Sequence, residues 1–524
     1  KVIVNSDNSL IVSDFDTSNI VTVNDDGSLT VTRNLRWLGT GKTVWNNKGN
    51  PVKQYEPYFS VSHQYEDFKE LVESGVTPVM YYDPVGRMTK TEFPNGTFSK
   101  TEFDSWKQII YDQNDTSLQS DWYNKYIIGS AKEQTAAQKS ADHANTPTEH
   151  HFDTLGRPVL QIENNGKTSG GIDILYNTIA ELDIEGNIRS VTDARNNVVM
   201  KYKYDMLGNM VYHESMDAGK RWMLHNIIGN PLRNWDERNH EIQFTYDILH
   251  RPLNSIVLRG DGAPLNNIFE RIIYGETQPN PVLNNLRGKP FRHFDTGGMI
   301  ETPKYDFKGQ PISTTRKLFK NYKSVANWVN ANLSINLENE KFTFTTETDA
   351  LGRITKQIAP DGSVITPSYN EAGLLNSEEV THPDLVKSKY IKNIDYNEKG
   401  QRDKIIYGND VITTYLYDKE TFRLVSLITT RIDNSLLQEL HYTYDAVGNI
   451  THIEDKAIPA EFFNNMRIEP ACEYTYDPLY RLIKATGREK KDSVLNFNSE
   501  DNWNDKPFIT QHEISDEMNV RNYS

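Results

Sequence analysis

The sequence is poor in the features that define several common classes of protein. It has a single cysteine, Cys472, so no disulfide can form within the chain, and cysteine usage does not separate an intracellular from an exported protein. No apolar run approaches the roughly 18 residues that a membrane-spanning helix needs. The first residues, Lys1 to Asn5, lack the build of a signal peptide, and no methionine starts the chain. We therefore expect an excised portion of a longer protein, without a membrane span.

Positive charge is also scarce. The 57 Lys and Arg residues face 72 Asp and Glu residues, the net charge is −15, and no basic block forms a stripe for phosphates. Nucleic acid is therefore not an expected partner. Hydrophobic residues make up only 37%, whereas aromatic residues reach 11%, which suits sheet faces better than helix bundles. A chain of 524 residues exceeds one ordinary core and indicates several domains or one extended repeat assembly.

A short phrase recurs along the chain: Asp, usually after Tyr, with Gly three positions later. The copies are Tyr82-Asp83 with Gly86, Phe152-Asp153 with Gly156, Leu182-Asp183 with Gly186, Tyr204-Asp205 with Gly208, Tyr246-Asp247 with His250 in place of Gly, Tyr305-Asp306 with Gly309, Thr348-Asp349 with Gly352, Tyr444-Asp445 with Gly448, and the looser Tyr369-Asn370, Tyr396-Asn397, Tyr417-Asp418 and Tyr476-Asp477. Several lie 21 positions apart, as do Asp205, Asn226 and Asp247. One copy is ordinary turn chemistry, but about a dozen on a shared spacing indicate a structural repeat.

The repeat is interpreted as one hairpin per unit. Large residues alternate before each turn, as in Ile242, Phe244 and Tyr246, which places them on one face of a sheet. The Asp accepts hydrogen bonds from backbone amides of the turn, and the Gly supplies a positive φ. The tyrosines are therefore expected to pack between neighbouring hairpins, with their hydroxyls reaching water or backbone, rather than to act in catalysis.

The number of strands predicts an all-β fold in which the antiparallel sheet coils. Two strands per repeat give more than about twenty strands, whereas an open twisted sheet rarely has more than about ten strands. The pattern leaves open whether the coil surrounds a filled core or a lumen. Helices are expected near residues 121–144, which are rich in helix formers, and 324–333, where apolar residues have helical spacing. We expect a linker or β region over 1–80, the repeat shell over 81–484 and a polar connecting segment over 485–524.

These repeats resemble those of the RHS or YD-repeat proteins, from about residue 80 onward. Two stretches, Arg36 to Glu66 and His143 to Val159, are similar to the B component (SpvB/TcdB-like) of bacterial insecticidal toxin complexes. The resemblance implies a spiral hollow shell, or cocoon, that B and C components form around the cytotoxic part of C. It also implies docking to a pore-forming A component through a propeller, for which this chain has no region of suitable size. Because the chain stops where a further repeat would follow, the shell is expected to be incomplete.

Other candidate sites fail on spacing. Asp83-Pro84 and Asp477-Pro478 lack the Asp-Pro-x-Gly-Leu stretch at which C-type RHS proteins cut themselves, and fit turns with Pro at a corner. Gly39 to Thr43 (GTGKT) has no Gly at the position that a phosphate loop requires. His143, His150 and His151 match no standard metal site. No nucleophile elbow or zinc-protease motif is present. We expect no catalytic residue, no metal and no cofactor.

The sequence therefore favours a non-enzymatic encapsulation scaffold, secreted as part of a toxin complex and partnered by a C-type RHS component. The alternative is an extracellular adhesion or glycan-binding repeat protein, whose aromatic and acidic side chains would line an outer surface. An enzyme embedded in the shell has little support. The 13 histidines leave a pH-linked release open, but none of them can be singled out.

Overall fold

The computed structural model describes residues 37–60, 76–329, 333–460 and 469–487 with their side chains. It describes the backbone alone of the strands at 2–4, 10–12, 19–23, 29–33, 461–463, 466–468 and 518–523, and of the end of one strand at 488–490. Within these residues the protein is nearly all antiparallel sheet, with two α-helices, which confirms the predicted fold class. No helix among the described residues is long and apolar enough to cross a bilayer.

Most strands belong to one large sheet, which we call the wall. Its first strands are β6 (Thr43–Trp45), β7 (Pro51–Gln54), β9 (Val79–Tyr82), β10 (Met88–Glu92), β11 (Phe98–Phe103), β12 (Lys107–Tyr111) and β13 (Thr148–Phe152). The middle strands are β14 (Pro158–Lys167), β15 (Asp173–Leu182), β16 (Ile188–Thr192), β17 (Val198–Tyr204), β18 (Met210–Ser215), β19 (Gly219–His225), β20 (Pro231–Asp236), β21 (His240–Tyr246), β22 (Pro252–Arg259), β23 (Leu265–Tyr274), β24 (Pro290–Asp295), β25 (Gly298–Tyr305) and β26 (Pro311–Leu318). The last are β27 (Phe342–Thr348), β28 (Ile354–Ile358), β29 (Val364–Tyr369), β30 (Leu375–Thr381), β31 (Lys387–Tyr396), β32 (Arg402–Tyr407), β33 (Ile412–Tyr417), β34 (Leu424–Thr430), β35 (Leu436–Tyr444), β36 (Ile450–Asp455), β39 (Ala471–Tyr476), β40 (Leu482–Lys490) and β41 (Met518–Tyr523).

Smaller sheets accompany the wall. A separate four-stranded sheet contains β1 (Val2–Val4), β2 (Leu10–Val12), β3 (Asn19–Val23) and β4 (Leu29–Arg33). Two further hairpin-like pairs are β5 (Trp37–Gly39) with β8 (Tyr58–Ser60), and β37 (Glu461–Phe463) with β38 (Met466–Ile468).

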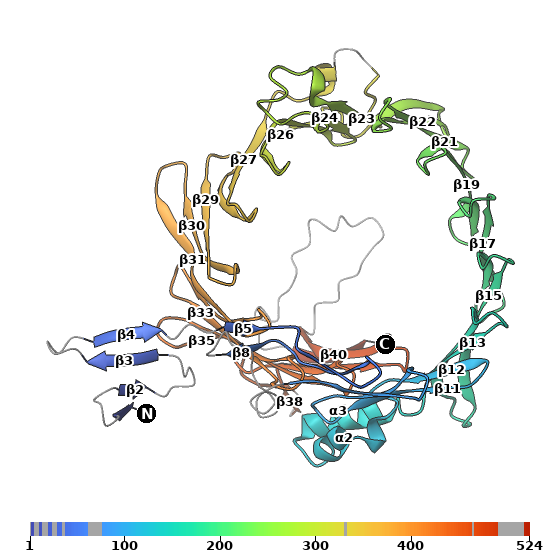
Figure 1. Cartoon of the computed structure of the whole chain (residues 1–524). Coiled ribbons are helices and arrows are strands. Elements are labelled where there is room, and N and C mark those ends of the chain that lie inside the picture. Colours follow the sequence, from blue (N-terminus) through green and yellow to red (C-terminus); the bar gives the residue numbers. More distant parts are fainter. Residues whose placement is uncertain are drawn as a thin grey trace.

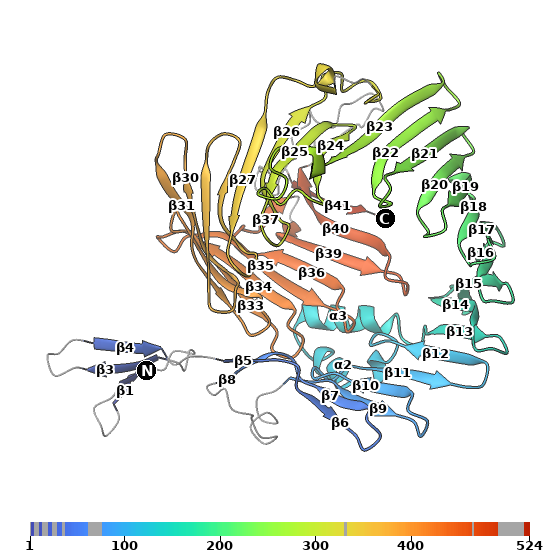
Figure 2. The same cartoon turned by 45° about the horizontal axis from the view of Figure 1, so that its top comes forward.

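The wall closes on itself. From β9 onward each strand pairs antiparallel with the next in sequence, except that β36 pairs with β39 past the β37–β38 hairpin. The strand order ends with β41 beside β6, so the sheet forms a ring (Figures 1 and 2). Register shifts fall just before many of the repeat turns, as between Lys203 and Tyr204 or Thr443 and Tyr444. Such bulges increase the local twist of a sheet and help it to curve.

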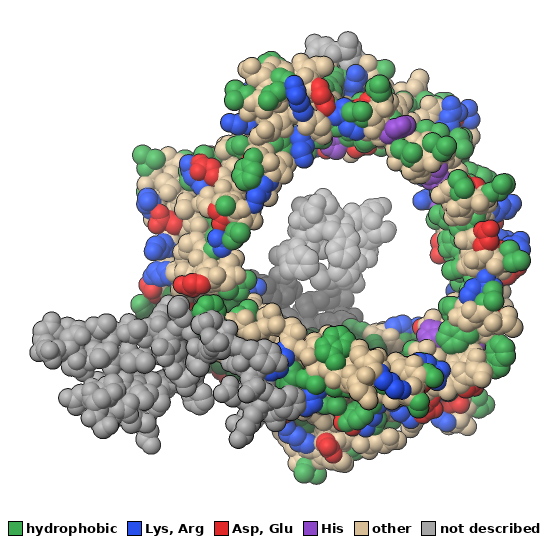
Figure 3. Space-filling model, in the orientation of Figure 1, with side chains coloured by type: hydrophobic (Ala, Val, Ile, Leu, Met, Phe, Trp, Pro, Cys, Tyr) green, Lys and Arg blue, Asp and Glu red, His purple; other side chains and the backbone are tan. Residues whose placement is uncertain are grey.

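The ring is hollow and one sheet thick over most of its circumference. A compact protein of 60.3 kDa has an accessible surface of roughly 19,000 Å², whereas this chain exposes 33019 Å². The described residues surround a central opening, and acidic and basic side chains are interspersed on the face shown (Figure 3). The sheet thus coils around a space, a point that periodicity alone could not settle.

Helices occupy the first predicted insertion. The connection between β12 and β13 contains the 3-10 helix η1 (Ser117–Gln119), α2 (Asp121–Tyr126) and α3 (Ala131–Ala141). Ser120 caps α2 by accepting from Tyr123 N, and Ser130 with Glu133 forms a capping box at the start of α3. We call residues 112–147 the helical insertion.

The second predicted helix is wrong over its described residues. Residues 324–329 are not helical, a 3-10 helix η3 (Leu333–Asn336) follows, and residues 330–332 lie outside the described chain. Trp328 is fully buried, its backbone N–H donates to Ile268 O at 2.8 Å, and its indole Nε1 donates to Asp295 O at 3.0 Å. The segment therefore binds across β23 and β24, and packing of this one aromatic side chain outweighs the helical spacing. Another short 3-10 helix, η2 (Gly275–Thr277), follows β23.

The ends of the predicted shell also differ in detail from the expected boundaries. β6 and β7 already join the wall before residue 80. The expected connecting segment 485–524 includes the end of β40 and all of β41, which pair with each other, and residues 491–517 lie outside the described chain.

Candidate functional site

Most of the repeat turns are closed by the same hydrogen bonds. Asp205 Oδ1 accepts from the backbone N–H groups of Leu207 at 2.8 Å and Asn209 at 2.9 Å, and its Oδ2 accepts from Asn209 Nδ2 at 3.0 Å. Gly208 has a φ of 78°, which a residue with a Cβ resists. These bonds hold the pKa of Asp205 below its usual value.

Most of the other predicted turns form the same arrangement, with Arg or Gln as the last residue. The accepting carboxylates are those of Asp83, Asp153, Asp247, Asp306, Asp349 and Asp477. Two turns differ: Asp445 Oδ1 accepts from Gly448 N and Asn449 N, and Asp418 Oδ1 accepts from Glu420 N and Thr421 N. Positive φ occurs at Gly86, Gly156, Gly309, Gly352 and Gly448, and also at His250 and Tyr480, which replace Gly in their turns. In most of the Arg turns the guanidinium adds a second bond, as Arg157 Nε does to Asp153 Oδ2 at 2.7 Å.

The tyrosines tie each turn to its neighbour. Tyr246 Oη donates to Pro231 O at 2.7 Å, and Tyr305 Oη donates to Pro290 O at 2.6 Å. In each case the acceptor is the first residue of the preceding strand in the wall. The same rule holds for Tyr82 with Pro51, Tyr369 with Ile354, Tyr396 with Leu375, Tyr417 with Arg402, Tyr444 with Leu424 and Tyr476 with Ile450. Tyr204 lies beside Tyr202, with ring centroids 6.4 Å apart.

The topology places these turns on one edge of the wall. Successive turns of an antiparallel meander alternate between its two edges. All the Asp-Gly repeat turns follow odd-numbered strands from β9 to β39, so they share one edge, which we call the YD rim. The connections that follow even-numbered strands, such as Phe93–Thr97 and the helical insertion, leave from the other edge, which we call the opposite rim.

The helical insertion, which leaves an early part of the wall, lies against the turn after β35 in a late part of the wall. Asn114 Nδ2 donates to Asp445 Oδ2 at 3.0 Å, and Asn114 Oδ1 accepts from Val447 N at 3.3 Å. Ser140 Oγ accepts from Ala446 N at 3.1 Å. Asn114, Ser140 and Ala446 are all fully buried. We call this junction between the helical insertion and the turn at Asp445–Asn449 the clasp.

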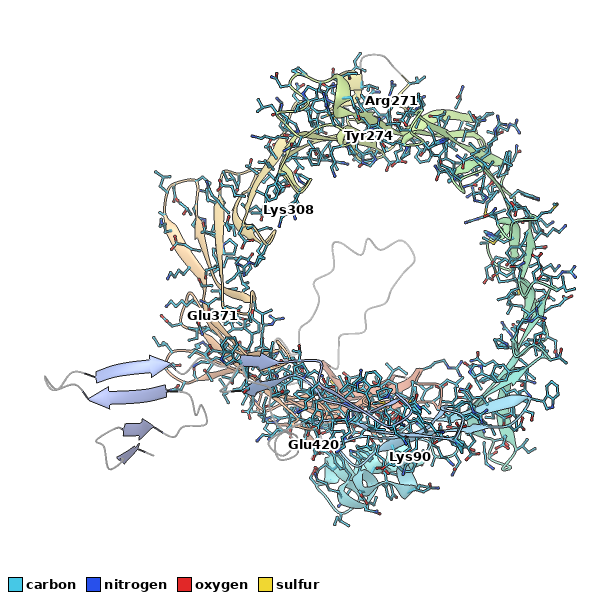
Figure 4. The ribbon with its side chains drawn as sticks, viewed as in Figure 1. Lys90, Arg271, Tyr274, Lys308, Glu371 and Glu420 are labelled. Atoms are coloured by element: carbon cyan, nitrogen blue, oxygen red, sulfur yellow. The ribbon has the colours of Figure 1, made fainter. Side chains whose placement is uncertain are left out.

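Further bonds extend the clasp to β39 and to the turn that follows it. His143 Nε2 lies 2.9 Å from Tyr476 O, and Lys139 Nζ donates to Tyr474 O at 2.7 Å. Tyr480 Oη donates to Asp112, and burial together with that carboxylate raises the pKa of Tyr480. Figure 4 places Lys90 from β10 and Glu420 from the turn after β33 in this same thick part of the ring, far from Arg271 and Tyr274 on β23.

Apolar packing accompanies these polar contacts. Trp122 and Ala137 of the helical insertion form a buried cluster with Ala446. Asp115, also largely buried, accepts from Thr146 N at 2.8 Å, and burial beside Asp112 raises its pKa to about 6. A cavity of about 440 Å³ lies next to the cluster and is lined by side chains of both signs, including Lys132, Glu133 and Arg423.

The clasp residues were not identified from the sequence. Asn114, Asp115 and Ser140 lie outside the repeat, so periodicity gives no information about them. One signal was present: the turn at Asp445 carries Ala446 where several other turns carry a large apolar residue, and a small side chain permits close packing.

The sites rejected on spacing have structural roles or positions on the wall. His143 belongs to the clasp, and His151 Nε2 lies 3.2 Å from Glu149 Oε2 on the same strand. Gly39 to Thr43 runs from β5 into β6. Asp83 and Asp477 each accept backbone bonds in a repeat turn. Among the described residues, no group of His, Cys, Asp and Glu is arranged to hold a metal ion.

The chain is similar to known toxin subunits. No family model matches the chain. Toxin subunit YenC2 of Yersinia entomophaga is 30% identical over 343 residues, which is 60% of this chain and 35% of that protein. Toxin subunit YenC1 of the same organism is 29% identical over 301 residues, 55% of this chain and 31% of that protein.

Solved structures match more of the chain. The structure of TcdB2–TccC3 superposes with a TM-score of 0.79 and 30% identity over 90% of this chain and 23% of that chain. The Tc holotoxin pore of Photorhabdus luminescens gives a TM-score of 0.79 and 29% identity over 93% of this chain and 23% of that chain. The chain thus spans about a third of the curated relatives and under a quarter of the solved chains. It is homologous to the YenC toxin subunits and shares the fold of TcdB2–TccC3, as an RHS-repeat segment of a toxin-complex component of the B or C type.

Proposed function

We propose that this protein is a non-enzymatic part of an encapsulating shell, which encloses the cytotoxic domain of a C-type RHS component for delivery into host cells. The observation that carries the proposal is the closed ring of single-layer sheet around a central opening. A single-layer sheet exposes both of its faces and so buries less apolar surface than a compact domain of the same size. Such a wall is suited to enclosing another protein rather than to forming a compact core.

The roles of the repeat side chains support a structural rather than a catalytic function. The repeated Asp, Gly and Tyr side chains are engaged in turn and strand contacts, as at Asp205 and Tyr246. The strongly buried polar cluster, at Asn114 and Asp445, joins an early and a late part of the sheet. These roles are structural, so we assign the chain no catalytic step.

We propose the B-type assignment for this chain. The stretches Arg36 to Glu66 and His143 to Val159 resemble the B component, whereas the curated relatives are named YenC. Both can hold if B and C components, which the resemblance describes as forming one shell, share this wall. The shell would be secreted with its C-type partner, and docking to the pore-forming A component would use a propeller outside this chain.

The test is co-expression of the full-length protein with the C-type component encoded beside it. We expect the two to copurify and the effector domain to resist a protease that digests it when it is produced alone. An effector cleaved equally fast in both samples would refute encapsulation. A glycan array on the full-length protein would then test the adhesion alternative, which predicts selective binding.

A further inference from the structure

Large apolar side chains stand exposed at the tips of consecutive turns on the YD rim. The exposed fractions are 92% for Ile184, 97% for Met206, 94% for Ile227 and 93% for Ile248. We call the following set the apolar row: Leu155, Ile184, Met206, Leu207, Ile227, Ile228, Ile248 and Leu249. It covers the turns from β13–β14 to β21–β22, and with two strands per turn at about 4.8 Å each it is about 40 Å long.

The turns themselves do not require these apolar residues. Their shape is set by the Asp, by the residue with positive φ and by the last residue, all of which bond to backbone or to each other. Later on the same rim the apolar tips are isolated: Phe307 and Leu351 are exposed after β25 and β27, whereas the next tips carry Glu371, Glu398 and Lys419. Contiguous exposed apolar side chains of this kind mark interaction surfaces.

The opposite rim of the same arc differs. Its connections consist largely of polar residues and Gly, as at Thr168–Gly171, Asp193–Asn197 and Glu237–Asn239. The large apolar side chains exposed there include Ile172, at 71%, and Met216, at 51%. The apolar character is therefore concentrated on one edge of the wall.

The chain itself shows how a YD turn is covered. At the clasp, the tip of the Asp445 turn lies under the helical insertion, which leaves from the opposite rim of an earlier part of the wall. Nearby, Lys399 on the YD rim pairs with Glu56 Oε2 at 2.9 Å, and a second cavity is lined by Pro94 of the opposite rim and Phe422 of the YD rim. Where two layers of wall meet, the YD rim of one meets the opposite rim of the other.

We propose that the C-type RHS component docks on the apolar row. The part of the C-type component that contacts the row would be the opposite rim of the C-type component's own repeat wall. This rests on the proposed function. The YenC subunits align with 60% and 55% of this chain, so they contain the same kind of wall and hence the same kind of opposite rim. The two tip positions of each of these five turns include one charged side chain, Glu185, so the docking rim must present mainly apolar side chains or small turns, as the helical insertion does at Ala446.

The test compares two double variants of the full-length protein, each adding two negative charges at exposed positions. Ile227→Asp with Ile248→Asp changes the apolar row, and Ile172→Asp with Met216→Asp changes the opposite rim of the same arc. We expect the first to raise the Kd for the C-type component at least about tenfold, as loss of central interface side chains does. The second should leave the Kd within about twofold.

The outcomes separate the two proposals. If the wild type does not bind the C-type component, the proposed function fails. If the wild type binds and protects the effector but both double variants bind equally well, only the docking surface is refuted. If the row variant binds normally while its own thermal stability falls, the row is covered by another part of the same protein, which also refutes docking of the C-type component there.

Discussion

The side-chain amide of Asn114 donates to the carboxylate of Asp445 at 3.0 Å, although 331 positions separate the two residues. Asn114 is fully buried and Asp445 is almost so. Asp445 is at once the first residue of a repeat turn and the acceptor of this bond. The same carboxylate therefore shapes a local turn and fastens the helical insertion after β12 to the turn after β35.

Replacing Asn114 should open the ring more readily. Asn114→Ala removes the bond to Asp445 and the acceptor of Val447 N, and it leaves a buried carboxylate with one donor fewer. We expect the free energy of unfolding, measured in urea, to fall by about 2 to 3 kcal/mol. Asn266→Ala, at an exposed position, serves as the control and should change it by less than about 0.5 kcal/mol. Equal effects of the two changes would mean that the clasp does not hold the ring.

Acidification should strengthen the clasp through Asp115. Burial and the neighbouring Asp112 raise the pKa of Asp115 from 3.8 to about 6 in the folded protein. The folded state therefore binds this proton more tightly, and the contribution of Asp115 to stability falls as the pH rises from about 4 to about 6. When the pH is lowered from 7 to 4, the free energy of unfolding of the wild type should rise by about 2 to 3 kcal/mol relative to that of Asp115→Asn. Parallel pH profiles for the two proteins would contradict the raised pKa.

The hydroxyl bonds of the repeat tyrosines can be tested singly. Tyr246→Phe removes the bond to Pro231 O while keeping the ring, so we expect a loss of about 0.5 to 1.5 kcal/mol in the free energy of unfolding. Tyr202→Phe changes a tyrosine that lies beside Tyr204 rather than at the end of its strand, and should have a smaller effect. A loss of stability in Tyr202→Phe as large as that in Tyr246→Phe would contradict the assignment of the Tyr246 hydroxyl to the bond between strands.

Backbone strain at the repeat glycines gives a further prediction. Gly208 has a positive φ, and a Cβ there would meet no atom within 4 Å, so we assign the cost of Gly208→Val to the backbone. We expect about 1 to 3 kcal/mol of destabilisation. Gly262 is equally open but lacks a positive φ, so Gly262→Val is the matched control. A thermal melting curve of Gly208→Val that coincides with the control would show that the turn tolerates a side chain.

The repeat was predictable because its chemistry is local. The bonds from Asp205 to Leu207 and Asn209 span two and four positions, so the sequence pattern contains everything that forms the turn. The excess of strands over what an open sheet tolerates also predicted that the sheet coils. The rule that joins Tyr246 to the first residue of the neighbouring strand is almost as local, but the sequence predicted only a backbone or water partner.

The clasp and the segment around Trp328 were not predictable in the same way. The partners of Asn114 lie in the turn after β35, and those of Trp328 lie on β23 and β24, so no local sequence pattern identifies them. Helical spacing at 324–333 failed because burial of Trp328 fixes an irregular backbone across β23 and β24. Long-range packing thus decides the places where the wall departs from its repeat.

The most direct test of the account is an electron cryomicroscopy map of the full-length protein co-purified with its C-type component. If the wall encloses the effector, the map will show a continuous wall of sheet with effector density inside the ring that these strands form. A map with the ring empty and the effector density outside it would show that this wall is not a container.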